Sequence, residues 1–249
     1  MSRLVWLTGG SEGIGRAVAL ELARRGDRVA VSARSADKLQ ALAAEAPEGR
    51  ILPYPLDITD REAVARTVAR IEAEQGPIDL ALLNAGTHKP VDAESFTVED
   101  IRLLVELNIM GTAHCLQPVI EAFRRRGRGH LAVVASVAGY RGLPTSAGYG
   151  ATKAALINMV ESLKPDFDRL GLKLQIVNPG FVRTPLTDKN EFAMPFLMEP
   201  EDAARALADG LDKAGFEITF PKRFTYMLKF LRCLPYALYF PLIGKATRK

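Results

Sequence analysis

The chain has 249 residues, of which 48% are hydrophobic and 25% charged, and its formal net charge is +4. This length suits one large α/β domain with a well-buried core, and the composition is ordinary for a soluble globular protein. The two cysteines follow no CxxC pattern and the three histidines are isolated, so we expect no disulfide framework, no metal site and a cytoplasmic location. The first eight residues predict a strand rather than a signal peptide.

Short apolar runs alternate with amphipathic segments, which predicts a parallel sheet built from βαβ units. Strands are expected at Leu4–Thr8, Arg28–Ala33, Ile51–Tyr54, Asp79–Asn84, His130–Ser136, Lys173–Asn178 and Phe216–Phe220. Helices are expected at Ile14–Arg25, Asp37–Ala46, Arg61–Glu74, Val98–Leu107, Gly111–Arg124, Tyr149–Leu170 and Pro200–Lys213. The predicted fold is α/β, a single doubly wound (Rossmann) domain with a seven-stranded parallel sheet over residues 1–220. It includes a substrate loop at 185–198 and carries a short helical extension at 221–249.

A glycine-rich turn joins the first expected strand to the first expected helix and reads Thr8-Gly9-Gly10-Ser11-Glu12-Gly13-Ile14-Gly15. Its glycines permit a tight turn, close approach of a diphosphate and close packing of the helix on the strand. The helix N-terminus at Ile14 offers free N–H groups and a positive dipole end to phosphate. A plain glycine-rich connection is the alternative, because such a motif gains weight only from its context.

Tyr149 and Lys153 are four residues apart on an expected helix, so their side chains share one face. A free tyrosine has a pKa of about 10, and a neighbouring ammonium favours the phenolate and lowers that pKa toward neutrality. The pair is therefore a candidate proton donor or acceptor for a carbonyl or alcohol. Ser136 ends an apolar strand, at the edge where ligands bind in such sheets. The alternatives are a surface Tyr–Lys pair and a serine that only caps the following turn.

The turn resembles the T-G-x-x-x-G-x-G motif of the short-chain dehydrogenase/reductase family, and further matches follow in the family's order. Asn84-Ala85-Gly86 matches the family's N-A-G segment, and Asp57 matches the acid that contacts adenine. Pro179-Gly180 is followed by Val182 and Thr184, as in the stretch that touches the nicotinamide. The resemblance implies cofactor contacts from Gly9, Ser11, Gly13, Ile14, Gly15, Arg34, Asp57, Asn84, Gly86, Tyr149, Lys153, Pro179, Gly180, Val182 and Thr184.

The resemblance also implies a catalytic set, Asn108, Ser136, Tyr149 and Lys153. A bound nicotinamide supplies hydride to a carbonyl carbon, and Tyr149 protonates the oxygen while Ser136 positions it. Lys153 lowers the Tyr149 pKa and bonds the nicotinamide ribose, and Asn108 holds a water that links Lys153 to solvent. The same groups support alcohol oxidation in reverse. Asn108 as a simple interruption of its helix is the alternative.

The end of the second strand indicates the cofactor. NAD-binding proteins of this type carry an acid there for the ribose 2′-OH, and this chain has Ala33 followed by Arg34. A guanidinium suits a 2′-phosphate, and Lys38 is one helical turn further on. Glu12 in the turn acts against this preference. We therefore predict NADPH/NADP over NADH, with a solvated Arg34 as the alternative.

The C-terminal segment is basic and aromatic. Seven basic residues and no acid lie between Ile218 and Lys249, so the rest of the chain has a net charge of −3 and nothing indicates nucleic acid. A helix is expected from Lys222 to Arg232, broken by Pro235 before a second aromatic stretch at 236–240. Its polar stripe is narrow, formed by Lys222, Thr225, Lys229 and Arg232. Three interpretations stay open for 221–243: a peripheral membrane contact, a lid, or a subunit interface.

We therefore expect an NAD(P)-dependent oxidoreductase that reduces a hydrophobic or lipid-like carbonyl substrate as a homodimer or homotetramer. Apolar residues of the substrate loop, Phe192, Met194, Phe196, Leu197 and Met198, suit an apolar pocket wall or the core. The alternatives are an NADP-linked alcohol dehydrogenase for a small soluble substrate and a catalytically silent cofactor-binding regulator. The location is cytoplasmic, with a peripheral position at a membrane as its variant.

Overall fold

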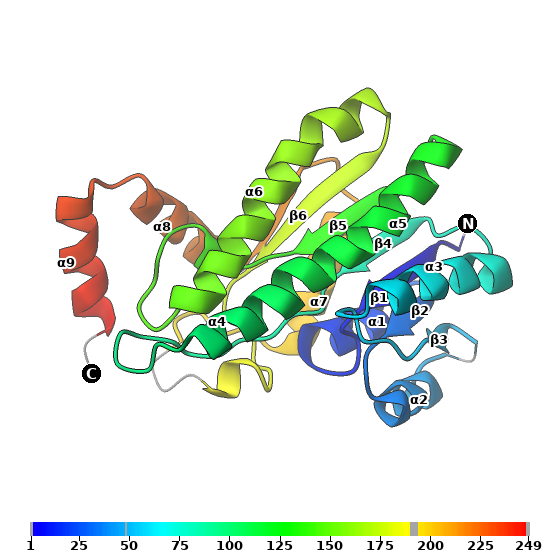
Figure 1. Ribbon diagram of the computed structural model, residues 1–249, viewed down its shortest axis with the longest axis horizontal. Coiled ribbons are helices and arrows are strands. Elements are labelled where there is room, and N and C mark those ends of the chain that lie inside the picture. Colours follow the sequence, from blue (N-terminus) through cyan, green and yellow to red (C-terminus); the bar gives the residue numbers. More distant parts are fainter. Residues whose placement is uncertain (1, 48, 190–193, 248–249) are drawn as a thin grey trace.

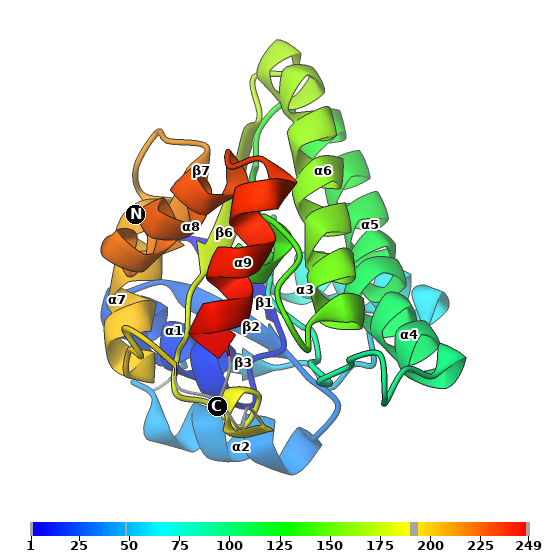
Figure 2. The ribbon, with the colours of Figure 1, turned by 90° about the vertical axis from the view of Figure 1, so that its left-hand side faces the viewer.

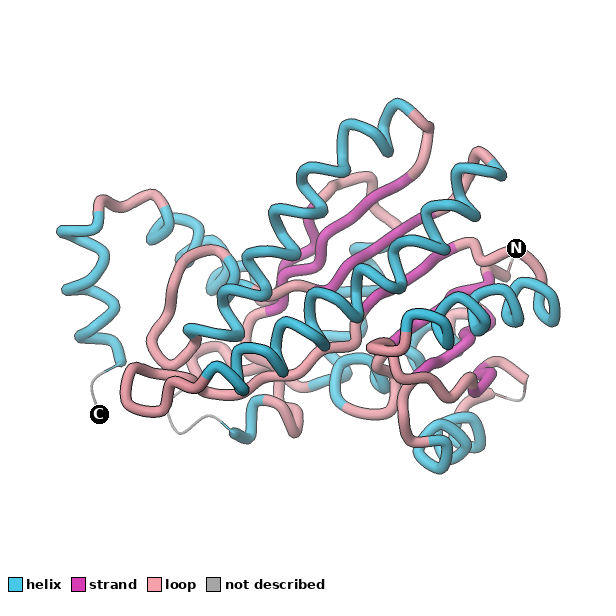
Figure 3. The backbone as a smooth tube through the Cα atoms, viewed as in Figure 1, coloured by secondary structure: helices cyan, strands magenta, loops and turns pink. Residues whose placement is uncertain are grey.

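The computed structural model describes residues 2–47, 49–189 and 194–247, and its centre is a seven-stranded parallel sheet (Figures 1 and 3). The strand order is β3-β2-β1-β4-β5-β6-β7. The strands are β1 (Leu4–Thr8), β2 (Arg28–Ser32), β3 (Ile51–Pro53), β4 (Leu80–Leu83), β5 (His130–Val134), β6 (Lys173–Pro179) and β7 (Glu217–Phe220). The predicted doubly wound sheet is confirmed. The order reverses between β1 and β4, and ligands bind at such a switch point.

Helices cover both faces of the sheet (Figure 1). They are α1 (Gly13–Arg24), α2 (Ala36–Glu45), α3 (Arg61–Gln75), α4 (Val98–Leu104), α5 (Gly111–Arg126), α6 (Ala147–Arg169), α7 (Pro200–Leu211), α8 (Lys222–Arg232) and α9 (Tyr236–Thr247). Helices α3, α5 and α6 bury apolar side chains in one core cluster, and α1, α2 and α7 bury theirs in another. The two clusters lie on opposite faces because successive side chains of a strand alternate.

Strand β1 shows why these sequences form buried strands. Leu4 and Trp6 belong to one core cluster, whereas Val5 and Leu7 belong to the other. A strand between two helical layers needs apolar side chains on both faces, which explains its uninterrupted apolar run. The indole Nε1 of Trp6 donates to Ser32 Oγ at 3.0 Å, so its polar atom is satisfied in the core.

The helices expected at Val98–Leu107 and Gly111–Arg124 form one continuous helix, Val98–Arg126, which corrects the predicted break. Its middle, Val105–Met110, is π-helical, a local widening of the kind that often marks functional sites. Among the described residues, this helix is apolar and long enough to cross a bilayer by length and composition. Its second half nevertheless packs into the core, where it buries Cys115, Leu116 and Val119.

The C-terminal extension is helical, as expected, and α8 has the predicted bounds. Pro235 separates it from α9, and Pro241 lies within α9 rather than after it. Figure 2 shows α9 in front of the sheet, on the side where the carboxyl ends of the strands lie. The predicted residues Phe192, Arg248 and Lys249 lie outside the described part of the chain.

Candidate active site

A cleft of about 520 Å³ opens at the carboxyl ends of β1, β2 and β4. It brings together most of the predicted cofactor residues, namely Gly9, Ser11, Gly13, Ile14, Gly15, Arg34, Asp57, Asn84, Gly86 and Thr184. Pro179, Gly180, Val182, Tyr149 and Lys153 are not in its lining. These predicted residues therefore line one cleft, which lies at the switch point of the sheet, and its volume is in the range of small-molecule sites.

The glycines of the turn are required by close contacts. Gly9 and Gly13 have φ angles of +70° and +54°, which side chains other than glycine rarely adopt. A Cβ on Gly15 would lie 2.2 Å from the Gly9 carbonyl oxygen and 2.5 Å from Asn84 Nδ2, so α1 packs directly on the turn. Glu12 precedes α1 and pairs with Lys38 rather than capping the helix. The first N–H groups of α1 therefore remain to bind a diphosphate.

Asn84 ties the turn to the end of β4. Its Nδ2 donates to the carbonyl oxygens of Thr8 and Gly9, at 3.2 and 3.1 Å. The Thr8 hydroxyl oxygen accepts in return from the backbone N–H groups of Asn84 and Ala85, at 3.0 and 3.2 Å. Asn84 and Thr8 thus hold the two strand ends that border the cleft. The sequence places Thr8 in the glycine-rich turn but does not indicate that its hydroxyl accepts these hydrogen bonds.

The far end of the cleft carries charges of both signs. Arg34 is exposed there. Lys38, which was expected to favour NADPH, forms an ion pair with Glu12, which was expected to act against it, so the charges of these two residues neutralise each other. Hydrogen bonds from the Thr59 N–H and hydroxyl lower the pKa of Asp57, although its burial acts to raise it, and the charge of Arg34 adds to the lowering.

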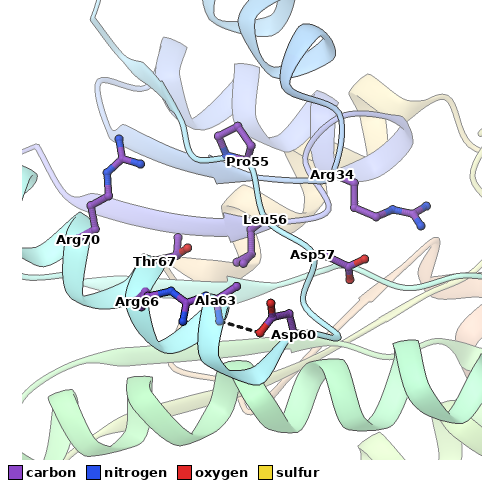
Figure 4. A pocket seen from close by; sticks show the side chains of 9 residues that line it. All are labelled: Arg34, Pro55, Leu56, Asp57, Asp60, Ala63, Arg66, Thr67 and Arg70. Atoms are coloured by element: carbon purple, nitrogen blue, oxygen red, sulfur yellow. Dashed lines mark hydrogen bonds between the residues drawn. The ribbon is translucent and has the colours of Figure 1, made fainter.

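A second pocket of about 600 Å³ shares Arg34, Leu56 and Asp57 with the cleft (Figure 4). Arg66 and Arg70 add two more cations to it.

Lys153 is buried on α6, with 4% of its surface exposed, and its Nζ donates to the Val134 carbonyl at 2.9 Å. Burial lowers the pKa of Lys153 to about 8. The Nζ lies 5.7 Å from the centre of the Tyr149 ring. Burial raises the pKa of Tyr149, and a hydrogen bond with Ser136 lowers it in part. The predicted lowering of this pKa by Lys153 is therefore wrong: removing the phenolate from water disfavours its charge, and the group that opposes the shift is Ser136.

Ser136 follows β5 by two residues and begins the short helix Val137–Gly139, a correction to the expected strand. Its Oγ accepts from the Ala138 N–H at 3.1 Å, and the serine lowers the pKa of Tyr149 through hydrogen bonding. The structure shows that this hydroxyl caps the turn, and its role toward a substrate stays a prediction. His88 packs edge-on against the Tyr149 ring, with 4.7 Å between ring centres, a contact that the sequence did not suggest.

Asn108 is fully buried in the π-helical segment. Its Oδ1 accepts from the Thr87 N–H at 2.8 Å, and its Nδ2 donates to the Thr87 carbonyl and to Thr152 Oγ1, both at 3.0 Å. Asn108 thereby joins the loop after β4 to α6. Gly86 lies against the same group, because a Cβ there would be 3.2 Å from Asn108 Oδ1 and 3.4 Å from Lys153 Nζ. Thr87 and Thr152 were missed, since isolated threonines carry no recognisable pattern.

The segment after β6 runs from this group to the cleft. The Gly180 N–H donates to the Phe220 carbonyl at 2.7 Å, and a Cβ on Gly180 would lie 2.9 Å from Phe224. Val182 is buried and bridges to Met198, which closes the base of the substrate loop. Thr184 then reaches the cleft, 2.9 Å from the position of a Cβ on Gly13. The described residues contain no group of three His, Cys, Asp or Glu side chains that could hold a metal.

Comparison with known proteins agrees with this geometry. The family model described as short chain dehydrogenase matches residues 3–194. An oxidoreductase of Myxococcus xanthus whose function is uncharacterised is 38% identical over 249 residues, 99% of this chain and 97% of its own. Levodione reductase has a TM-score of 0.82 at 26% identity, covering 90% of this chain and 98% of its own. ElxO with NADP bound has a TM-score of 0.79 at 26% identity, covering 88% and 98%.

The family model covers more than half of the chain, and the curated relative spans nearly all of it. The cleft lies at the N-terminus of α1, where dinucleotide-binding folds hold the diphosphate of their cofactor. The chain belongs to the short-chain dehydrogenase/reductase family, whose members are oxidoreductases that act on CH–OH and C=O groups of small molecules.

Proposed function

We propose that this protein reduces a hydrophobic carbonyl compound to an alcohol with NADPH, and that Tyr149 donates the proton. The observation that carries this proposal is the position of Tyr149 beside the buried Lys153, whose Nζ lies 5.7 Å from the centre of the Tyr149 ring. Ser136 supports it, because its hydrogen bonding lowers the pKa of Tyr149. A bound nicotinamide would supply the hydride. The similar protein ElxO binds NADP, which supports a nicotinamide cofactor for this cleft.

The residues have separate parts in this chemistry. Because its pKa is raised, Tyr149 stays protonated at neutral pH and can give its proton to the oxygen that becomes an alkoxide. Ser136 positions that oxygen by hydrogen bonding. Lys153 carries a positive charge below pH 8 and stabilises the phenolate that remains. Asn108 holds Thr87 and Thr152, and so fixes the loop and helix between which these groups lie.

The cofactor would lie along the cleft, with its diphosphate at the N-terminus of α1 and its adenine end near Asp57. Arg34 would bind the 2′-phosphate. Pro179, Gly180, Val182 and Thr184 would line the nicotinamide end, since they lead from β6 to Gly13.

Arg34→Ala is expected to weaken NADPH binding and leave NADH binding nearly unchanged. A charge-assisted hydrogen bond contributes about 1.5–3 kcal/mol, so the dissociation constant of NADPH should rise about 10- to 100-fold. Quenching of the cofactor's fluorescence by the protein measures both constants. Arg66→Ala is the matched control, because Arg66 lines only the neighbouring pocket. An equal change for NADPH and NADH would contradict the proposed preference.

The reaction itself is tested with 2-ketones and 3-keto esters of rising chain length, by following NADPH oxidation. We expect kcat/KM to rise with chain length, since each buried methylene contributes about 0.8 kcal/mol, or about fourfold. Highest efficiency for the shortest ketones would overturn the hydrophobic substrate. Absence of NADPH oxidation with every compound, in a protein that still binds NADPH, would favour a silent cofactor-binding regulator.

A further inference from the structure

The C-terminal helices carry an unusual share of exposed apolar side chains. These are Tyr226, Met227, Phe230, Tyr236, Leu238, Phe240 and Leu242, all within 17 residues of chain. Tyr236 and Phe230 are 68% and 67% exposed. Exposed apolar side chains gathered in one segment in this way are typical of an interaction site rather than of a requirement of the fold.

Helix α8 turns part of its polar stripe toward the protein. Thr225 is fully buried and donates to Thr219 Oγ1 at 3.1 Å, and Lys229 forms an ion pair with Glu217. Phe224 and Leu228 pack into the core cluster beside them. The opposite face, which carries Arg223, Tyr226, Met227 and Phe230 at helical spacing, is left exposed.

Helix α9 is fixed at a few points and exposed over the rest of its length. Tyr239 is 2% exposed and donates to the Gly142 carbonyl at 2.6 Å. The guanidinium of Arg141 lies over the rings of Tyr239 and Tyr236, at 3.9 and 4.8 Å, and donates to carbonyls at the end of α8. These contacts hold both helices in place. The segment from Tyr236 to Gly244 carries no charge.

We propose that the exposed face of α8 and α9 binds peripherally to an anionic lipid surface. Lys222, Arg223 and Arg232 are exposed around the apolar side chains, and the chain has no acid after Glu217. Aromatic and apolar side chains bordered by cations, without acids, complement the interface of a bilayer that contains anionic lipids. With 11 and 12 residues, the helices are shorter than the roughly 20 residues that a span requires, so they lie in the surface.

The placement of α9 gives this contact a consequence. Figures 1 and 2 show α9 on the side of the sheet where the carboxyl ends of the strands lie. Tyr239 of α9 is hydrogen-bonded to Gly142, which belongs to the segment between Ser136 and Tyr149. Binding to a bilayer through α9 would therefore bring the lipid close to the segment between Ser136 and Tyr149. The inference does not depend on the proposed reaction, although a lipid-like substrate would be met at this surface.

The test is flotation of the full chain with vesicles of phosphatidylcholine alone or with phosphatidylglycerol, at low and high salt. We expect the chain to float with the anionic vesicles, less so at high salt. Lys222→Gln/Arg223→Gln should weaken partitioning by about fivefold for each cation lost. Phe230→Ser/Phe240→Ser should abolish flotation. Thermal melting and NADPH binding of each variant establish that it is folded.

Two matched controls define the surface. Leu170→Ser removes an exposed apolar side chain at the end of α6, and Arg125→Gln removes an exposed cation of α5. Both variants should float like the unaltered chain. Failure to float with either vesicle would overturn the proposal, as would equal losses in the controls. Light scattering that shows a dimer broken by Phe230→Ser/Phe240→Ser, without vesicle binding, would assign the face to a second copy of the chain.

Discussion

Tyr149→Phe is expected to lower kcat by about 10²- to 10⁴-fold, the usual contribution of a positioned general acid. The substitution removes one oxygen and leaves the ring, which keeps its edge-on contact with His88. NADPH binding should therefore stay within a few-fold of its original value. The measurement is kcat from NADPH oxidation with the best ketone of the panel, together with the NADPH dissociation constant from fluorescence.

The matched control is Tyr54→Phe, which removes a phenol that donates to Glu74 at 2.7 Å and does not line the cleft. Its kcat should be unchanged, because the hydroxyl contributes only to stability. If Tyr149→Phe kept kcat within tenfold of the unaltered enzyme, another group would supply the proton and the proposed mechanism would be wrong. Ser136→Ala would then show whether the serine acts alone.

Lys153→Met is expected to abolish most turnover and at the same time to stabilise the fold. Burial lowers the pKa of Lys153 from 10.5 to about 8, and a pKa lowered by one corresponds to about 1.36 kcal/mol, so the buried ammonium costs folding about 3 kcal/mol at neutral pH. The substitution also removes the hydrogen bond from Lys153 to the Val134 carbonyl, and this loss reduces the gain in stability by about 1 kcal/mol. A net stabilisation of about 2 kcal/mol should appear in urea unfolding.

The sign of the pH dependence follows from the lowered pKa. Below pH 8 both the folded and the unfolded chain carry the proton, and the full cost of the buried charge is present. As the pH rises from about 8 to 10.5, the folded lysine becomes neutral before the unfolded one, so the cost disappears. The stability difference between Lys153→Met and the unaltered protein should therefore shrink over that range.

Lys164→Met is the control on the same helix. Lys164 is paired with Asp168 on the surface of α6, and such exposed pairs contribute about 1 kcal/mol or less. Lys164→Met should show no loss of turnover, and its urea unfolding is measured beside that of Lys153→Met at each pH. A Lys153→Met protein that is less stable than the original at every pH would contradict this prediction. It would show that interactions of the folded chain fully offset the free-energy cost of burying the ammonium.

Much of the site was predictable because its residues carry local patterns. The turn from Gly9 to Gly15 combines positive φ angles with contacts that leave no room for a Cβ, so only glycine fits. Thr8, Thr87 and Thr152 were not predictable, because their hydrogen bonds join Asn84 and Asn108 across separate segments. The π-helical segment around Asn108 was missed as well, since the packing of a continuous helix determines it.

The sequence by itself predicted the order of strands and helices, the glycine-rich turn and, together with the family resemblance, the candidate set of Ser136, Tyr149 and Lys153, because periodicity, spacing and motifs are local properties. Tertiary structure decided the electrostatics. Tyr149 lies where burial raises its pKa despite the nearby ammonium, and Glu12 and Lys38 cancel each other's charge. It also decided which face of α8 is exposed, since Lys229 turns toward Glu217 and leaves Phe230 in water. Burial and partner choice depend on chain segments far apart in the sequence, and no single helix or strand encodes them.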